Sequence, residues 1–429
     1  MPNDFYIYKT QKQRLKHLDI NEFIALKALC RYSKDMFNIA NYNIRQFFFE
    51  NDKYLSYCKN YDKVKNHNVY KLLGSTYSQK VLKKLDASYK SFFELIKKKN
   101  KGEYDAFVKL PSYLDKNGYF SLINDMFCIN NGILKVPMSR EFEQLYGKVN
   151  IKVPSNLLDK EITQIEIIPK YDCEYFEIHY TYKVSVKELN LNKSNFLSID
   201  VGLNNLCTCT TNKGFAFIID GKYLKSINQF ANKQDAYFKA ILNKQGLFHS
   251  KRIYSIWKNR NNKIEDYLNK TVNYIINYCI KNDIGSIVIG YNTDITNSPN
   301  IGKINNQNFI NIGISQLRTK LKDKCITYGI EFIEQEESYT SKASFIDKDD
   351  IPVFGKLPKD AEGNDIKPTF SGSRIHRGLY KTKEGILLNA DVNGSLNIMR
   401  KTGIVDFSKF KLKNLKVIQR INPLLKQAA

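Results

Sequence analysis

The chain has 429 residues, which is longer than one average domain, so we expect about two or three domains. Its hydrophobic fraction of 42% is enough to give each domain a core. Lys and Arg outnumber Asp and Glu by 67 to 43, which leaves a net charge of +24. Such an excess is larger than a surface needs for solubility, and it favours a polyanionic partner. We therefore expect a nucleic acid as the partner rather than an anionic membrane surface.

Two other classes of protein are excluded by the same inspection. There is no apolar signal core at the start and no run of about 18 apolar residues that could cross a membrane. The eight Cys include no C-x-x-C pair, which is typical of reduced thiols in a cytosolic chain. We therefore expect a cytoplasmic protein with no membrane partner.

The N-terminal half combines a strand pattern with a helical one. A short strand is predicted at 5–9, and apolar residues recur at spacings of three and four from about 20 to 100. From about 104 to 188 the period shortens toward two and turn residues recur, which indicates short strands. The pattern predicts a β-barrel formed by 1–19 and 101–190, interrupted by a helical domain over 20–100.

The C-terminal half begins after a polar break at 188–195. Strands, a helical stretch from about 229 to 282, an apolar strand "SIVIGYN", a helix ending at Gly329 and another strand follow in that order. A loop-rich segment at 341–388 precedes a short strand that turns into a last helix, and 403–429 is a basic tail. This order predicts an RNase H-like α/β domain over 191–402, in a multidomain α+β chain. That fold places acids at strand ends along one edge of a mixed sheet.

Two Asp residues stand where such a fold places its acids. Asp200 ends an apolar strand, and Asp391 precedes the last helix. Alone, Asp200 could cap a turn and Asp391 could be a helix N-cap. The D-x-G at Asp200 also occurs in sugar kinases and actin-like ATPases, but the continuation "LNNL" lacks their Gly-rich phosphate turn. Together the two acids favour phosphodiester hydrolysis by two metal ions, a reaction that needs about two or three convergent carboxylates and suits Mg²⁺.

Four segments of the C-terminal half resemble the TnpB proteins of bacterial insertion-sequence transposons, which are related to the compact type V CRISPR effectors. The likeness covers about 195–402, and it rests on "LSIDVGLNNL", the run from "NTDITNSPN" to "TKLKDK", "EQEESYTSKASFIDKDDIP", and the run from "FSGSRIHRGLYK" to "DVNGSLNIMRK". Asp200 matches the first and Asp391 the last RuvC aspartate. The N-terminal half fits only in organisation, as a wedge-type barrel that a helical recognition domain interrupts.

The resemblance implies an RNA-guided DNA endonuclease with a RuvC domain that uses Mg²⁺ or Mn²⁺. It would bind a noncoding guide RNA made from the transposon end and cleave double-stranded target DNA beside a short adjacent motif. It also implies a bacterial, nucleoid-associated protein that acts alongside a separate transposase.

Two departures from the family pattern stand out. The four-Cys zinc ribbon before the last Asp is missing, because no Cys follows Cys325 and His376 alone cannot hold zinc, so no zinc is expected. The usual RuvC glutamate is missing too, because Gly290, Tyr291 and Asn292 end the strand "SIVIGYN".

The missing carboxylate can come from another segment or be absent. Glu337, nearest the turn after the neighbouring strand, is our first candidate, Glu336 the second, and Asp294 a weaker third. Strand alternation places Glu334 and Glu336 on one face and Glu337 on the other. The alternatives are that these acids are only solvated, so that the protein is a catalytically inactive RNA-guided DNA-binding repressor, or that it is an unguided transposase accessory protein.

Basic residues with interleaved aromatic residues are candidate nucleic-acid contacts, because such patches track phosphates and stack on unpaired bases. The alternative is a solvated helix face or loop. The candidates are Lys251, Arg252, Lys258 and Arg260 in one run, and Arg374, Arg377 and Lys381 in another.

Overall fold

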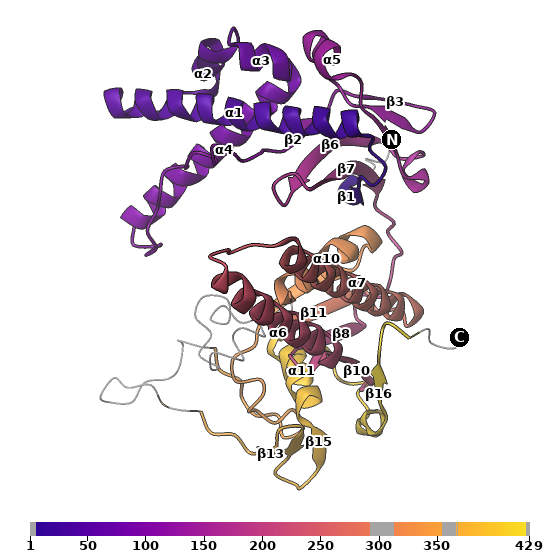
Figure 1. Cartoon of the computed structure of the whole chain (residues 1–429). Helices are drawn as coiled ribbons and strands as arrows, with labels where there is room; N and C mark the ends of the chain where they lie inside the picture. The colour runs from indigo at the N-terminus through magenta and orange to yellow at the C-terminus, as the bar shows by residue number, and fades with distance from the viewer. Residues whose placement is uncertain (1–5, 292–312, 354–365, 367, 426–429) are drawn as a thin grey trace. The chain divides into compact units, whose positions relative to one another are not determined.

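The computed structural model describes residues 6–291, 313–353, 366 and 368–425. The chain divides into two compact units, Met1–Ser185 and Val186–Ala429 (Figure 1). Each unit has its own hydrophobic core.

The first unit contains a helical block at the place where the apolar spacing predicts helices. Its longest helix, α1, runs over Ile20–Asn51 and starts with a capping box in which Asp19 and Glu22 each accept a backbone N–H of the other. The block also contains α2 (Tyr57–Val64), α3 (Asn68–Leu73) and α4 (Ser75–Asn100). A further helix, α5 (Arg140–Tyr146), lies in the segment that was predicted as part of the barrel. Buried Leu29 of α1 and Tyr89 of α4 belong to the core of this unit.

Two antiparallel sheets complete the first unit. In the larger sheet the order is β1-β7-β6-β2, formed by Tyr6–Arg14, Tyr175–Ser185, Ile162–Lys170 and Leu122–Asn124. The smaller sheet joins β3 (Cys128–Asn130), β4 (Ile133–Lys135) and β5 (Asn150–Lys152), followed by the short 3-10 helix η1 (Ser155–Leu157).

The described residues of this unit do not form a closed barrel. Among the described residues no strand pair links the two sheets. A closed barrel needs continuous pairing with a fixed stagger, whereas β2, β3, β4 and β5 have only three residues each. The structure shows the predicted barrel segments as two open sheets.

A six-stranded mixed sheet forms the centre of the second unit. Its order is β12-β11-β8-β9-β10-β16, and the strands are Glu331–Glu336, Ser286–Tyr291, Phe196–Val201, Asn205–Thr211, Ala216–Asp220 and Ile418–Ile421. Strands β8, β11 and β12 are parallel neighbours, so their carboxyl ends meet at one edge. The last strand, β16, pairs with β10 in parallel. The segment predicted as a basic tail therefore contributes a strand to the sheet.

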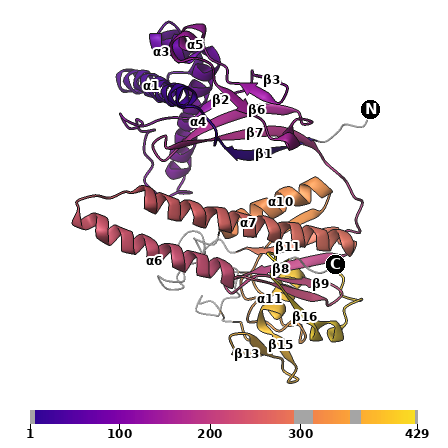
Figure 2. The same ribbon diagram turned by 45° about the vertical axis from the view of Figure 1, so that its right-hand side comes forward.

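Helices cover both faces of this sheet (Figure 2). On one face α6 (Lys222–Lys244), α7 (Lys251–Lys281) and α10 (Ile314–Tyr328) share a core with Leu197, Ile199 and Ile287. On the other face α11 (Ala390–Lys401) packs through Ile398 against Phe196 and Val288. Successive strand residues point to opposite faces, so even-numbered positions of β8 and β11 face α11.

The predicted helical stretch from about 229 to 282 is two helices. The first helix begins earlier than predicted, at Lys222, and the helical structure is interrupted between Gln245 and Ser250. Gly246 has a positive φ of 66°, which ends α6, and the Ser250 side chain accepts from Ile253 N to start α7.

The loop-rich segment contains a small three-stranded sheet of β13 (Ser373–His376), β14 (Leu379–Lys381) and β15 (Leu387–Asn389). Asp349 anchors it by accepting hydrogen bonds from the N–H and hydroxyl of Ser371. After α11 the chain forms the 3-10 helix η2 (Leu412–Lys416) and then β16.

Among the helices that the structure describes, none is both long and apolar enough to cross a lipid bilayer. All eight Cys are free thiols, and only Cys58 and Cys128 are exposed.

Candidate functional site

Asp200 lies near the end of β8, on the face that α11 covers. The residue is partly buried. A Cβ added to Gly394 of α11 would lie 3.0 Å from Asp200 Oδ2, closer than ordinary van der Waals contact. Glycine at this position therefore allows the helix backbone to pass directly over the carboxylate.

Asp391 lies in the first turn of α11 but does not cap it. The N-cap is Asn389, whose side chain accepts the backbone N–H groups of Asp391 and Val392. The Asp391 carboxylate is left to other partners: Asn205 Nδ2 donates to Oδ2 at 2.7 Å, and Arg374 Nη2 donates to Oδ1 at 3.0 Å. The alternative that Asp391 is an N-cap is wrong.

Hydrogen bonds one helical turn later fix α11 on the sheet. Ser198 Oγ donates to Ser395 O at 2.7 Å, and Ser395 Oγ donates back to Ser198 O at 3.1 Å. The hydroxyls of Thr210 and Ser395 are 2.9 Å apart. These buried polar contacts set the register between the helix that carries Asp391 and the strand that carries Asp200.

Glu337 fills the empty end of β11. Its backbone N–H continues the strand pairing of β12 by donating to Tyr291 O at 3.2 Å. A Cβ added to Gly290 would lie 2.7 Å from both Glu337 Oε2 and Ile398 Cδ1. The carboxylate therefore occupies the space next to Gly290 on the face toward α11, where a side chain from β11 would otherwise project.

The neighbouring acids have other partners. Glu336 accepts from Lys401 Nζ and from Ser338 N, both at 2.6 Å, and Lys401 also donates to Ser338 O at 2.8 Å. Glu334 points to the opposite face, where Arg318 of α10 lies 3.1 Å away. Only Glu337 of the three has its carboxylate beside Gly290.

The pKa values separate the acids further. Burial, then the nearby Glu337 and Asp391 carboxylates, raise the pKa of Asp200 to about 8, against the smaller opposing effect of Arg374. Burial, then Glu336, raise the pKa of Glu337 to about 7, although Lys401 opposes this. Burial also disfavours the charged form of Glu336, but the bonds from Lys401 and Ser338 outweigh it and lower its pKa. The site thus concentrates carboxyl groups with too little positive charge to keep all of them ionised.

The question for these carboxylates is whether their arrangement and chemistry suit a metal ion. No group of three or more His, Cys, Asp or Glu side chains within the described ranges is already arranged around a common point that could hold an ion. Both Asp391 oxygens are bonded to Arg374 and Asn205. The donor set still suits a hard divalent cation, because it is composed of carboxylate oxygens whose mutual repulsion a cation would relieve. Asp294, the weaker candidate, lies outside the described residues.

The predicted basic residues lie in the small β13–β15 sheet and on α7. Arg374 reaches the carboxylate site, whereas Arg377 and Lys381 are exposed in the small β13–β15 sheet. Arg252 and Arg260 line a groove between α6 and α7, and Lys251 and Lys258 on α7 do not line it.

Several residues of the site were missed by sequence reasoning. Lys401 and Asn205 carry no motif that marks them as neighbours of the acids. Asn393 and Asn397 did offer a signal, because they stand one turn apart in "DVNGSLNI" and face one side of a helix. Asn393 Nδ2 donates to Ala343 O at 2.8 Å and Asn397 Nδ2 to Thr340 O at 2.9 Å, which holds the segment after Glu337 against α11.

Comparison with sequence families gives two matches. Residues 179–296 match OrfB_IS605, described as a probable transposase. Residues 315–398 match the Cas12f1-like TNB domain. The two matches include Asp200, Glu337 and Asp391 between them. Comparison with curated proteins gives no match.

Comparison with solved structures gives a likeness over most of the chain. The structure described as a Cas12f1-sgRNA-target DNA complex aligns with a TM-score of 0.58 and 14% identity, covering 90% of this chain and 83% of that one. The structure of the mini-RNA-guided endonuclease CRISPR-Cas_phi3 aligns with a TM-score of 0.41 and 11% identity, covering 92% of each chain. The first likeness shows a mixed α/β multidomain fold of the Cas12f kind.

Proposed function

The chain resembles TnpB and Cas12f proteins in sequence and fold, and from this premise we propose that it is an RNA-guided DNA endonuclease of an insertion-sequence transposon. Its substrate is double-stranded DNA next to a short adjacent motif, and its guide is a noncoding RNA from the transposon end. The net charge of +24 supports a nucleic acid as the partner. The Cas12f1 structure to which it is similar was solved with guide RNA and target DNA.

Asp200, Glu337 and Asp391 are the proposed ligands of Mg²⁺ or Mn²⁺ in this site. Bound there, the ions would supply an activated water and stabilise the charge that develops on the phosphate oxygens. The residues of the chain hold the acids in place: Ser198 and Ser395 fix α11 over β8, and Asn205 orients Asp391. Arg374 lies at the exposed side of the site, where its guanidinium suits a phosphate of the strand to be cut.

One observation carries the proposal, namely the position of Glu337 beside Gly290. The strand that lacks the family glutamate has a glycine there, and a carboxylate from the next strand fills the space above it. Glu336 is the poorer candidate, because its charge is already neutralised by Lys401, which is only 4% exposed. We therefore assign Glu337 as the third acid and Glu336 as the partner of Lys401.

A second candidate function is a guided DNA-binding repressor without cleavage. The contact of Arg374 with Asp391 favours it, because a cation already pairs with one of the proposed ligands. The two candidates differ in their products and not in their binding.

The test is to sequence the RNA that co-purifies with the protein and then to assay a matched DNA duplex with Mg²⁺. If the protein is a nuclease, it will cleave the duplex, and either EDTA or Asp200→Asn will abolish cleavage. The wild type and Asp200→Asn will both bind the duplex. Binding without any Mg²⁺-dependent product would favour the repressor. Activity that survives removal of the RNA would favour an unguided accessory protein and contradict both.

A further inference from the structure

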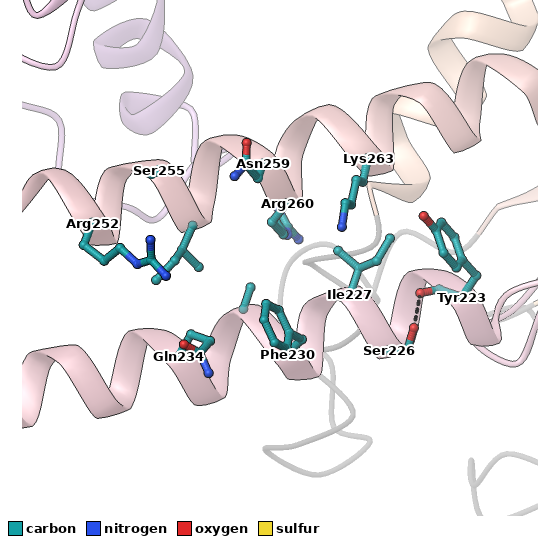
Figure 3. A pocket seen from close by; sticks show the side chains of 12 residues that line it. Tyr223, Ser226, Ile227, Phe230, Gln234, Arg252, Ser255, Asn259, Arg260 and Lys263 are labelled. Carbon is teal, nitrogen blue, oxygen red and sulfur yellow. Dashed lines mark hydrogen bonds between the residues drawn. The ribbon is translucent and has the colours of Figure 1, made fainter.

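A groove separates α6 from α7, on the sheet face opposite the carboxylate site. Its volume is about 480 Å³, within the range of about 300–1,000 Å³ of sites that hold small molecules. Figure 3 shows the two helices side by side, with Phe230 of α6 rising into the space between them. Arg252 and Lys263 lie along α7 on either side of Phe230 (Figure 3).

The lining of the groove is positively charged. Its charged residues are Arg252, Arg260 and Lys263, and none of its lining residues is Asp or Glu. Helical periodicity explains the gathering, because positions 252, 256, 260 and 263 share one face of α7. The described part of the chain gives Lys263 no carboxylate partner. The groove therefore attracts an anion.

An aromatic side chain adds a second kind of contact. Phe230 is 64% exposed although it lines the groove, and the floor beside it is formed by buried Ile227 and Ala231. An exposed aromatic ring between cations is the arrangement that binds unpaired bases by stacking while the cations contact phosphates. An acidic peptide would use the cations but gain little from the ring.

The groove is longer than one nucleotide. Arg252 and Lys263 are three helical turns apart, about 16 Å along the axis, and a stacked strand advances by about 3.4 Å per nucleotide along its own axis. Arg260, between them, is held by Asn228, whose Oδ1 accepts from its Nε at 2.7 Å. The cations are therefore spread along a path and not focused on one point.

From these observations we infer that the α6–α7 groove binds a short unpaired nucleic-acid strand, with one base stacked on Phe230 and phosphates at Arg252 and Lys263. The inference extends the proposed function, since it gives a strand of the guide or of the opened target a defined place away from the acids. The test below needs no cleavage, so its failure and the failure of the nuclease are separate results.

Trp257 provides a local reporter for binding in the full chain. It is the only Trp, its Nε1 donates to Asp235 Oδ1 at 2.8 Å, and the Arg260 guanidinium lies 5.7 Å from the centre of its ring. The RNA-free protein is titrated with an unstructured ten-nucleotide oligothymidylate while Trp257 emission is recorded. Oligouridylate in a parallel titration shows whether the groove prefers DNA or RNA.

Variants separate the groove from the rest of the basic surface. Phe230→Ala is expected to weaken the Trp257-detected binding about tenfold, as expected for one stacked base, and Phe230→Trp restores binding measured by fluorescence anisotropy of a labelled oligonucleotide. Arg252→Ala reduces the salt dependence of binding by about one phosphate contact. The matched controls are Tyr237→Ala, an aromatic of α6 that is 61% exposed outside the groove, and Lys270→Ala on α7, and both leave affinity unchanged.

Two outcomes would overturn the inference. The first is a Trp257 signal that an abasic strand of the same length or polyglutamate produces with equal affinity, which would make the groove a general anion surface or a site for an acidic protein. The second is equal loss of affinity in Phe230→Ala and Tyr237→Ala, or no Trp257 response to either oligonucleotide.

Discussion

The Glu337 carboxylate lies in the space that a side chain at Gly290 would occupy. The two residues belong to neighbouring parallel strands, so a ligand lost from one strand can be supplied by the other without moving the sheet. This relationship makes the exchange of the two positions testable.

Moving the carboxylate from position 337 to position 290 should restore part of the activity that Glu337→Ala loses. Glu337→Ala is expected to reduce the cleavage rate at least about 100-fold, more than the loss of an outer-shell partner of a metal site. Adding Gly290→Glu to that variant should recover about tenfold, because the new side chain enters the space that Glu337 left. Gly290→Glu alone should be inactive, since it clashes with Glu337 and adds a like charge. Equal activity of the single and double variants in a cleavage time course would contradict the exchange.

Lys401 should stabilise the end of β12 through its ion pair with Glu336. Lys401→Met leaves Glu336 without its cationic partner and is expected to cost about 2–3 kcal/mol, below the roughly 3–5 kcal/mol of a fully buried pair because Glu336 is 24% exposed. The measurement is the urea midpoint followed by Trp257 fluorescence. Lys401→Met combined with Glu336→Gln should regain most of the loss, and additive losses in this double-mutant cycle would show that the pair is not coupled.

The stability of the metal-free protein should depend on pH with an unusual sign. The pKa of Asp200 is raised from 3.8 to about 8, so between these values the folded state holds a proton that the unfolded state has lost. Unfolding free energy should therefore be highest near pH 4 and fall as the pH rises toward 8, by up to about 1.4 kcal/mol per pH unit for each such proton. Glu337, with a pKa raised to about 7, adds to this slope up to about pH 7.

Urea titrations at several pH values test this dependence. Asp200→Asn should remove its part of the slope, and Mg²⁺ should flatten the wild-type curve because a bound cation replaces the protons. A wild-type stability that rises from pH 5 to pH 8 without metal would contradict the assigned burial of these acids.

Arg374 should set the pH at which the site becomes active. Its charge lowers the pKa of Asp200, so Arg374→Gln should move the half-maximal point of Mg²⁺-dependent cleavage to higher pH. Lys381→Gln, on the neighbouring strand of the same small sheet, is the control and should leave the midpoint in place. A pH–rate profile that shifts equally in both variants would assign the effect to general surface charge.

Chain order, strand ends and the positions of Asp200 and Asp391 were predictable, because apolar periodicity marks buried strands and acids at their ends stand out. The preference for Glu337 over Glu336 rested on its place nearest the turn, and the partner that Glu336 has in the structure could not be read from the sequence. Lys401 lies 65 positions after Glu336, and only the packing of α11 brings the two side chains within 2.6 Å. The partner of a polar side chain depends on tertiary contacts that periodicity does not encode.

The same limit applies to the ends of the chain and to the barrel. The tail after 402 was read as a basic extension because its strand, β16, has only four residues, too few for a clear alternation. A pattern of short strands was predicted over about 104–188, but whether they close into a barrel depends on pairings between distant segments, such as β1 with β7.

The central claim is that Asp200, Glu337 and Asp391 form one metal-dependent nuclease site. Its most direct test is cleavage of a matched duplex by the guide-RNA complex of the wild type, Glu337→Gln and Glu336→Gln, with target binding measured in parallel. We predict that all three bind the target, that Glu337→Gln does not cleave, and that Glu336→Gln retains Mg²⁺-dependent cleavage. Full cleavage by Glu337→Gln, or loss of cleavage in Glu336→Gln alone, would contradict the claim.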